Sequence, residues 1–416
     1  MEVRADGPPS LAVEFISESP RTRSPGPHHR AQSPDLDEEK VIMSKIRFGI
    51  IGCGWVGNLK HLDMYSKRPD TEILAISDLS ADAMAAAKRR HGIPDTKEYT
   101  DYKQLLADPD IDAVCIATPH PLHAQMTIDA LNAGKHVICE KPMATTVADA
   151  EAMIEASKRN GRVLTVGYQW RFRPETLYMK QYVESGALGE IYYAKAHATR
   201  RRSVPAWGFY TDIEQSGGGV LLDGAPHAID LTLWLMDNYD VASVRGNVYR
   251  KLWDQPEGNV WGEWDPERFT ADDAAFALIT MRNGATIYLE SSWALNIADP
   301  EDQATTLCGT KAGIDMHGAF GSGHTPNTGV RINEVKGGKL SILEPDTRIL
   351  PLPGVAQAPS PFQYEADHFL DAIRTGSDPA VLPEQALVVT RIVEAVYRSS
   401  ETGKTVYFDE SGKMTD

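Results

Sequence analysis

Residues 44–166 alternate short apolar runs with longer stretches that carry helical periodicity. Short apolar runs separated by helical segments are typical of parallel strands that are buried on both faces and connected by helices. The alternation predicts a doubly wound α/β domain over residues 44–166. The expected strands are residues 46–51, 73–77, 113–117, 136–139 and 163–168, and the expected helices are residues 59–67, 81–91, 102–107, 121–133 and 147–160.

The pattern changes after about Gly167 to longer segments in which apolar and polar residues alternate. Such segments predict a mostly antiparallel sheet, and we expect them at residues 190–200, 242–252, 274–281 and 285–293. Asn283-Gly284 joins the last two and predicts a two-residue hairpin turn with positive φ at both positions. We therefore expect a second α/β domain over residues 167–416, with a large, mostly antiparallel sheet and helices at residues 217–236, 362–374 and 384–399.

Residues 1–43 are rich in Pro, Ser and charged residues and show no hydrophobic period. Such a segment cannot bury enough apolar surface to fold, so we expect a disordered leader. Met43 stands directly before the first expected strand, and the ordered protein could effectively begin there. The leader is then either an artefact of the assigned start site or a regulatory tail.

The chain carries 58 Asp and Glu against 42 Lys and Arg, a formal net charge of −16. A protein this acidic repels polyanions, which argues against nucleic acid as a partner. The four scattered cysteines suggest neither a disulfide framework nor a spaced zinc site, and fit a reducing compartment. No apolar stretch approaches the length of a membrane span, and the amino terminus lacks a secretory signal. We expect a cytoplasmic protein without a membrane partner.

The sequence GCGWVG at residues 52–57 follows the first expected strand and opens a helix. In the pattern Gly-x-Gly-x-x-Gly the glycines permit a tight turn and a close backbone approach, and the helix N-terminus offers N–H groups to a pyrophosphate. An acidic residue closes the second expected strand 21 residues further on, where a dinucleotide site needs a carboxylate for the ribose. A purely structural turn is the alternative, but strand, spacing and acid together favour a Rossmann domain. The expected cofactor contacts in this part are Gly52, Gly54, Trp55, Val56, Gly57 and Asp78.

The residues after this acid bear on the choice between NAD and NADP. Asp78 is followed by Leu79 and Ser80, and its charge would repel a 2′-phosphate, which favours NAD. The basic run at residues 88–90 on the next expected helix argues in the other direction without reversing the choice.

Two further motifs follow neighbouring strands of the first domain. ATPHPLH occupies residues 117–123, and Glu140-Lys141-Pro142 follows the strand at residues 136–139. In an open α/β sheet, ligands bind at the carboxyl ends of the strands. A lysine held there over a nicotinamide can stabilise the alkoxide of an alcohol substrate and help to move its proton. The alternative, a solvated surface lysine, fits poorly between a buried strand and a proline.

Asp223 and His227 follow three glycines in the second domain. If the helix begins near Asp223, Pro226 lies in its first turn, where a missing N–H is harmless. His227 then lies near the positive end of the helix dipole, which favours a neutral, proton-accepting imidazole. Asp223 could cap the helix, orient the imidazole or bind a substrate hydroxyl. The remaining His and Cys residues form no second cluster at ligand spacing, so we expect no required metal.

Taken in this order, GIIGCGWVGNLKH, ATPHPLH, EKP and GGGVLLDGAPHAIDLTLWLM resemble the Gfo/Idh/MocA oxidoreductases over about residues 45–400. The resemblance implies a Rossmann domain followed by an α/β domain whose large sheet shields the nicotinamide and builds oligomers face to face. It also implies that His227 is the general base and that Lys141 lies beside the nicotinamide, and Asp223 and His227 match the family's Asp-x-x-x-His pair. By the same resemblance Glu140 would fix the nicotinamide ribose, and Thr118, His120, His123, Trp170 and Arg171 would contact the cofactor, His120 standing where relatives commonly carry Asn.

The run ATRRRSVPAWGFYTD resembles the branch of the family that oxidises sugars and glycosides, including glycoside 3-dehydrogenases. Arg201, Arg202, Trp207 and Tyr210 could form a substrate wall, since aromatic faces pack on sugar C–H groups and polar tips bond hydroxyls. The resemblance implies that Arg171 also lies near the substrate. Trp207 and Tyr210 could equally be core or interface residues.

We therefore expect an NAD-dependent dehydrogenase that oxidises a secondary ring hydroxyl of a sugar, glycoside or cyclitol, and that forms a homo-oligomer such as a dimer or tetramer. Two alternatives remain. One is glycoside cleavage through transient oxidation and β-elimination, with no net redox change. The other is a nucleotide-dependent sensor without turnover, for which Lys141, Asp223 and His227 together would have no chemical use.

Overall fold

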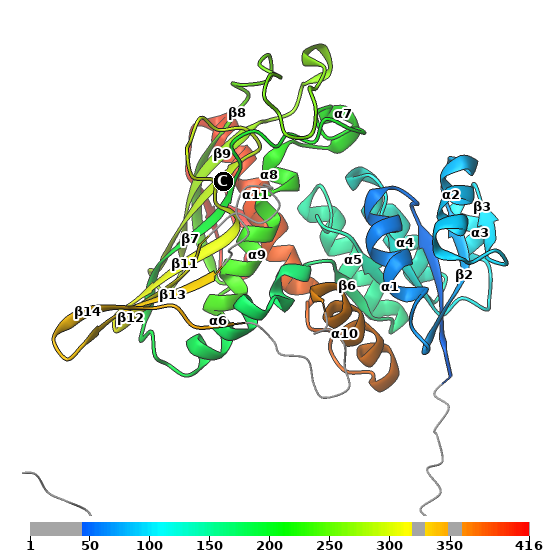
Figure 1. Cartoon of the computed structure of the whole chain (residues 1–416), viewed down its shortest axis with the longest axis horizontal. Coiled ribbons are helices and arrows are strands. Elements are labelled where there is room, and N and C mark those ends of the chain that lie inside the picture. The colour runs from blue at the N-terminus through cyan, green and yellow to red at the C-terminus, as the bar shows by residue number, and fades with distance from the viewer. Residues whose placement is uncertain (1–43, 318–328, 348–359, 416) are drawn as a thin grey trace, which may run out of the picture. The chain divides into compact units, whose positions relative to one another are not determined.

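The structure is a computed structural model that describes residues 44–317, 329–347 and 360–415. The expected leader, residues 1–43, lies outside the described residues. The part from Ser44 onward forms one compact unit with two sheets. Figure 1 shows helices packed against each of them.

The first sheet has six parallel strands in the order β3-β2-β1-β4-β5-β6. This is the order of a dinucleotide-binding fold, in which the direction of winding reverses between the first and fourth strands. All five expected strands are confirmed to within two residues. The strands are β1 (Ile46–Ile51), β2 (Thr71–Ser77), β3 (Lys97–Tyr99), β4 (Ala113–Ile116), β5 (His136–Cys139) and β6 (Leu164–Val166).

The helices around this sheet begin and end where local sequence signals place them. Ser80 and Thr146 cap the N-termini of α2 and α5 through their side chains, and glycines with positive φ end both helices. The first expected helix differs, because the chain forms a wide π-type turn at Gly57–Leu62 before a short α1 (Asp63–Tyr65). The others are α2 (Ala81–His91), α3 (Tyr102–Leu106), the 3₁₀ turn η2 (His120–Leu122), α4 (His123–Asn132) and α5 (Val147–Asn160).

The second sheet has ten strands in the order β14-β13-β12-β11-β7-β10-β9-β8-β15-β16. Neighbouring strands are antiparallel except for β7 and β10, which run parallel, so the expectation of a mostly antiparallel sheet is confirmed. Its strands are β7 (Ile191–Thr199), β8 (Val241–Tyr249), β9 (Ala274–Met281), β10 (Thr286–Ser292), β11 (Asp302–Gly309), β12 (Ala312–His317), β13 (Gly329–Lys336), β14 (Lys339–Leu343), β15 (Val406–Phe408) and β16 (Met414–Thr415).

The hairpin between β9 and β10 exists, but its turn differs from the expected one. The N–H of Met281 donates to Ala285, which leaves three residues in the loop instead of two. Gly284 has φ of 91°, whereas Asn283 keeps a negative φ. A type I turn closed by a left-handed glycine gives this geometry, so the expectation of positive φ at both positions was wrong.

Helices α9 and α11 lie on one face of the ten-stranded sheet (Figure 1), where α9 packs on β7 and β11 and α11 packs on β8. Their buried side chains join those of the sheet in one continuous core. The remaining elements are the 3₁₀ turns η3 (Gln169–Phe172) and η4 (Pro266–Arg268) and the helices α6 (Pro174–Glu184), α7 (Ile213–Ser216), α8 (Val220–Asp223), α9 (Ala225–Met236), α10 (Pro361–Thr375) and α11 (Pro383–Thr402).

Helix α10 comes late in the chain but packs on the first sheet. Its Phe369 ring lies 6.2 Å from that of Phe48 on β1, and both belong to one buried cluster with Tyr65. The last part of the chain therefore completes the core of the nucleotide-binding half. Across the described residues, no helix combines the length and apolar character that crossing a membrane requires.

Candidate active site

A cavity of about 800 Å³ opens at the carboxyl ends of β1, β2, β4 and β5. This edge includes the point where the strand order reverses, which is where open α/β sheets bind ligands. The segment that holds Trp207 and Phe209 faces it from the second half of the chain. Of the residues expected to form the site, Gly52, Gly54, Trp55, Val56, Asp78, Thr118, His120, His123, Glu140, Lys141, Trp207 and Tyr210 line the cavity.

The three glycines of the first motif have different physical roles. Gly52 has φ of 98°, and a Cβ there would collide with the Ala117 carbonyl. A Cβ on Gly57 would collide with the carbonyl of Gly52, so this glycine lets the first turn approach β1. Gly54 meets nothing within 4 Å and faces open space. The loop therefore has room for a phosphate group beside its backbone N–H groups, which fits a dinucleotide.

Asp78 lies where the dinucleotide pattern requires its acid. One carboxylate oxygen accepts the N–H of Cys53 and the other accepts that of Ser80, both at 2.8 Å. The nearby basic residues do not line the cavity. Lys88 pairs with Glu98 at 2.8 Å, and Arg89 and Arg90 are exposed to solvent.

Lys141 lies on the cavity wall and reaches across to the second half of the chain. Its Nζ donates to the Asp223 carboxylate at 2.6 Å and to the Asp223 carbonyl at 2.9 Å. The other carboxylate oxygen accepts the Trp293 indole N–H at 3.2 Å. Burial opposes ionisation of this carboxyl, but the charge of Lys141 holds its pKa well below its usual range. The structure thus brings together an ammonium and a carboxylate from two expected motifs.

Asp223 does not cap the helix that follows. Helix α9 has Gly224 at its N-cap and no side-chain capping bond, and Pro226 lies in its first turn as expected. The capping role suggested by the sequence is therefore wrong, because the carboxylate is turned toward Lys141 and Trp293.

His227 follows on α9, one turn after Asp223. It is 8% exposed, and its Nδ1 has no hydrogen-bond partner in the part of the chain that the structure describes. Burial, and then the charge of Lys141, lower its pKa well below the usual value. A neutral imidazole with a free acceptor is a competent base in chemical terms.

Glu140 sits in a buried ion cluster that the sequence did not suggest. Its Oε1 accepts from Lys60 Nζ at 2.6 Å and lies 2.8 Å from His61 Nε2. Lys60 also bonds Glu365 of α10 at 2.8 Å. Burial raises the pKa of Glu365 to about 7, whereas Lys60 keeps that of Glu140 well below its usual range despite burial. No local pattern joins Lys60 to Glu365, since they lie at opposite ends of the described chain.

The two histidines of ATPHPLH differ in their partners. His123 lies 2.7 Å from the Pro142 carbonyl and 2.9 Å from the Thr118 carbonyl, and so ties together the loops after β4 and β5. His120 is also buried, but its Nδ1 has no partner among the described residues. Its ring lies 6.4 Å from that of Phe209 and 6.0 Å from that of Tyr210.

Seven of the expected site residues lie outside the cavity lining, namely Gly57, Trp170, Arg171, Arg201, Arg202, Asp223 and His227. The guanidinium of Arg171 is 1% exposed and forms a two-point ion pair with Asp230, so it cannot reach a ligand there. Arg202 instead donates to the Gln255 carbonyl at 3.0 Å. Trp170 packs 6.0 Å from the His227 ring. The direct ligand contact expected of Arg171 is therefore not formed, whereas Trp170 and Arg202 lie outside the lining and their expected contacts stay predictions.

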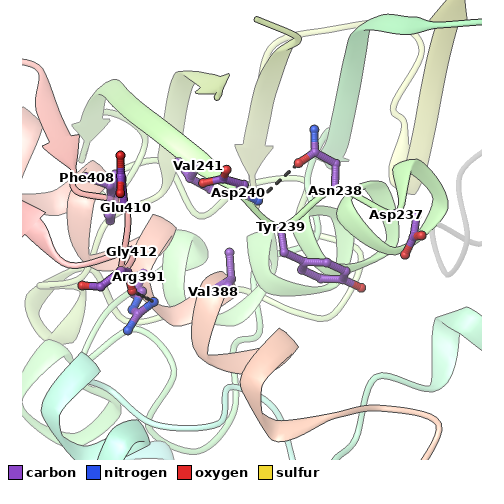
Figure 2. A pocket seen from close by; sticks show the side chains of 11 residues that line it. Asp237, Asn238, Tyr239, Asp240, Val241, Val388, Arg391, Phe408, Glu410 and Gly412 are labelled. Atoms are coloured by element: carbon purple, nitrogen blue, oxygen red, sulfur yellow. Dashed lines mark hydrogen bonds between the residues drawn. The ribbon is translucent and has the colours of Figure 1, made fainter. Parts of the chain in front are cut away.

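A second hollow, of about 480 Å³, lies between the end of α9, α11 and the last strands (Figure 2). Asp240, Glu410 and Arg391 are among the residues that line it, and none of the expected site residues is. Away from both hollows, His197 lies 3.0 Å from Glu301 and 3.3 Å from Glu290 on the ten-stranded sheet. Neither the second hollow nor the cluster around His197 brings together the groups that a hydride transfer needs.

Comparison with known proteins agrees with the fold of the two halves. The sequence model of the "Oxidoreductase family, NAD-binding Rossmann fold" matches residues 46–168. That of the "Oxidoreductase family, C-terminal alpha/beta domain" matches residues 180–408. The chain is 31% identical over 366 residues to D-glucoside 3-dehydrogenase of Escherichia coli (strain K12), covering 88% of this chain and 98% of that one.

Two further comparisons concern levoglucosan dehydrogenase. The enzyme of Pseudarthrobacter phenanthrenivorans is 32% identical over 255 residues, or 58% of this chain and 60% of that one. A solved structure of levoglucosan dehydrogenase in complex with NADH and levoglucosan superposes with a TM-score of 0.73 at 23% identity, over 88% of this chain and 99% of that one. At that identity, the superposition establishes the fold.

Proposed function

Because the chain belongs to the Gfo/Idh/MocA family of NAD-binding oxidoreductases, we propose that it transfers a hydride between NAD and a secondary ring hydroxyl of a sugar, glycoside or cyclitol. The product would be a keto-sugar. The observation that carries the proposal is Lys141 on the cavity wall, bonded to Asp223, with His227 one turn further along the chain. The names of the relatives support the sugar class, and oxidation at C3 follows the E. coli relative.

A bound nicotinamide supplies the hydride acceptor, and the chain's own groups handle the proton. Lys141 has three N–H donors, of which Asp223 takes two, so one remains for the substrate oxygen. A positive charge there stabilises the developing alkoxide. His227 takes the hydroxyl proton, since its imidazole is neutral and its Nδ1 has no partner among the described residues.

The cofactor contacts are assigned to the same cavity. The backbone at Gly52 and Gly54 would hold the pyrophosphate, and Asp78 would bond the ribose. Glu140 and Thr118 would lie nearer the nicotinamide. We propose NAD over NADP, because Asp78 lines the cavity at the end of β2, where its carboxylate would repel a 2′-phosphate, and residues 88–90 do not line it.

The substrate would enter beside the aromatic segment that faces the Lys141 end of the cavity. Trp207, Phe209 and Tyr210 all line it, and Trp207 is 45% exposed. Aromatic faces of this kind pack on the C–H groups of sugars. This supports the wall proposed for Trp207 and Tyr210 and adds Phe209 to it.

We further propose that the protein forms a homo-oligomer through the face of the ten-stranded sheet opposite α9 and α11. Side chains such as Tyr249 and Leu278 are 37% and 50% exposed there, and an apolar sheet face is commonly covered by a second copy. The four cysteines are free, which supports a reducing compartment such as the cytoplasm.

The test is a coupled measurement of NADH and sugar product with a panel of hexoses, glycosides and cyclitols. We expect NADH to form in step with a keto-sugar and NADP to serve poorly. Release of an aglycone with NAD unchanged would point instead to glycoside cleavage by β-elimination. Tight NADH binding without turnover of any member of the panel would contradict the dehydrogenase and favour a sensor.

A further inference from the structure

His120 carries a polar atom that the proposed chemistry does not use. The side chain lines the main cavity and is 5% exposed, yet its Nδ1 has no hydrogen-bond partner within the described residues. Buried polar atoms in folded proteins nearly always have a partner, because an unmade bond costs the full loss of hydration. An orphaned acceptor on a cavity wall therefore points to a ligand.

The position of the ring shows which ligand group it would meet. His120 begins the turn η2 after β4, and its ring makes edge contacts with Phe209 and Tyr210. The charges of Lys141 and Asp223 both act on it. His120 thus lies near the Lys141–Asp223 pair, where the substrate would bind.

The protonation state of the His120 ring determines whether Nδ1 donates or accepts a hydrogen bond. Burial, followed by the charge of Lys141, lowers the pKa of His120 to about 3. His123 adds to this effect, while Asp223 and a hydrogen bond from the ring to the Ser216 backbone oppose it. The ring is therefore neutral at physiological pH. Since its one N–H serves Ser216, Nδ1 is left with a lone pair and can only accept.

We propose that His120 Nδ1 accepts a hydrogen bond from a non-reacting hydroxyl of the sugar substrate, which makes His120 a specificity-determining residue. The proposal rests on the proposed function. A ribose hydroxyl of the nucleotide offers the same chemistry, but the Phe209 and Tyr210 rings flank His120 on the side of the expected sugar wall. We therefore assign the donor to the sugar.

Three substitutions at His120 distinguish the effect of losing the hydrogen-bond acceptor from the effect of losing the ring. In His120→Asn, the amide oxygen stands as many bonds from Cβ as Nδ1 does, so an acceptor remains in place. In His120→Gln the corresponding oxygen lies one bond further out, near the place of Nε2. His120→Phe keeps the ring contacts and removes the acceptor. His368→Phe is a matched control, because His368 stacks on Phe172 outside the cavity.

The experiment measures glycoside binding to the enzyme–NADH complex by titration calorimetry, which needs no turnover. We expect His120→Phe to weaken glycoside binding about 10-fold, the usual loss when a bond to a buried acceptor is removed. His120→Asn should stay within about 3-fold of the unmodified protein, with His120→Gln between the two. NADH affinity and the thermal midpoint should hardly change. In a series of monodeoxy glycosides, one member should bind the unmodified protein about 10-fold more weakly and lose nothing further in His120→Phe.

Other results would overturn the proposal. Equal losses in His120→Asn and His120→Phe would show a packing role. A weaker NADH affinity in His120→Phe, with unchanged discrimination among deoxy sugars, would assign the donor to the ribose. If the unmodified protein binds NADH but no polyol of the panel, the proposed function itself fails. If it binds a glycoside and His120→Phe binds it equally well, only the role of His120 fails.

Discussion

The motif Glu140-Lys141-Pro142 contributes one residue to each of two buried lysine–carboxylate pairs. The two pairs differ in what surrounds them. Lys60 and Glu140 have side chains 7% and 8% exposed, and His61 and Glu365 complete a closed cluster around them. Lys141 and Asp223 are 16% and 11% exposed, and Lys141 borders the cavity. Glu140 also lines the cavity, but its Oε1 is held by Lys60 and His61, whereas Lys141 of the second pair keeps a donor for a ligand. Similar ion pairs therefore serve structure in one place and chemistry in the other.

The largest expected effect comes from removing the lysine that borders the cavity. Lys141→Met should lower kcat by about 10³-fold, because it removes the group that stabilises the alkoxide. NADH affinity, measured by fluorescence titration, should change little. Turnover within a few-fold of the unmodified protein would remove Lys141 from the proposed mechanism.

The equivalent substitution in the closed cluster, Lys60→Met, should lower the stability of the folded protein. Lys60→Met leaves two buried carboxyls without their cation, and breaking such a pair costs about 3–5 kcal/mol. We expect a loss of this size in the free energy of unfolding from urea denaturation. If Lys60→Met is as stable as the unmodified protein but inactive, the contrast between the two pairs is wrong.

The pH dependence of stability tests the same cluster. The pKa of Glu365 is raised from 4.5 to about 7 by burial, so the folded protein holds a proton that the unfolded chain releases. Its stabilising contribution is complete below about pH 4.5 and is lost as the pH rises through about 7. Relative to Glu365→Gln, the unfolding free energy should fall by up to about 3 kcal/mol between pH 5 and 8. Parallel pH curves for the two proteins would show that Glu365 does not titrate in this range.

The smallest effect concerns the indole that supports Asp223. Trp293→Phe keeps most of the buried ring and removes the N–H that donates to the carboxylate at 3.2 Å. Loss of one such bond should lower kcat about 3- to 10-fold. The NADH affinity should stay the same, and a large fall in the thermal midpoint would instead indicate that the ring acts through packing.

The nucleotide half could be predicted from sequence because its signals are local. The glycine spacing, Ser80 and Thr146 at helix starts and the apolar runs all act within a few residues, and the structure follows them. Asn283 shows the limit of such signals, since the same dipeptide fits a two- or a three-residue loop and the pairing of the flanking strands selects between them.

Contacts between residues far apart in the chain have no local sequence signal. The motif around Arg171 predicts a ligand contact, but its guanidinium instead forms an ion pair with Asp230 on α9. The meeting of Lys60 with Glu365 depends on where α10 packs, which no local pattern encodes. The sequence predicts that Lys141 and Asp223 lie in the same site, but it does not predict that they bond to each other. The structure shows that direct bond.

The placement of α10 has a consequence for how the protein is made. Synthesis proceeds from the amino end, so β1 and the turn at Gly57–Leu62 leave the ribosome long before Phe369 and Glu365. Until then, the Phe48 ring lacks one of its aromatic neighbours and Lys60 lacks one of its two carboxyl partners. A nascent chain that has finished its first sheet is therefore still an incomplete nucleotide-binding half, and a fragment cut after β6 would stay so permanently.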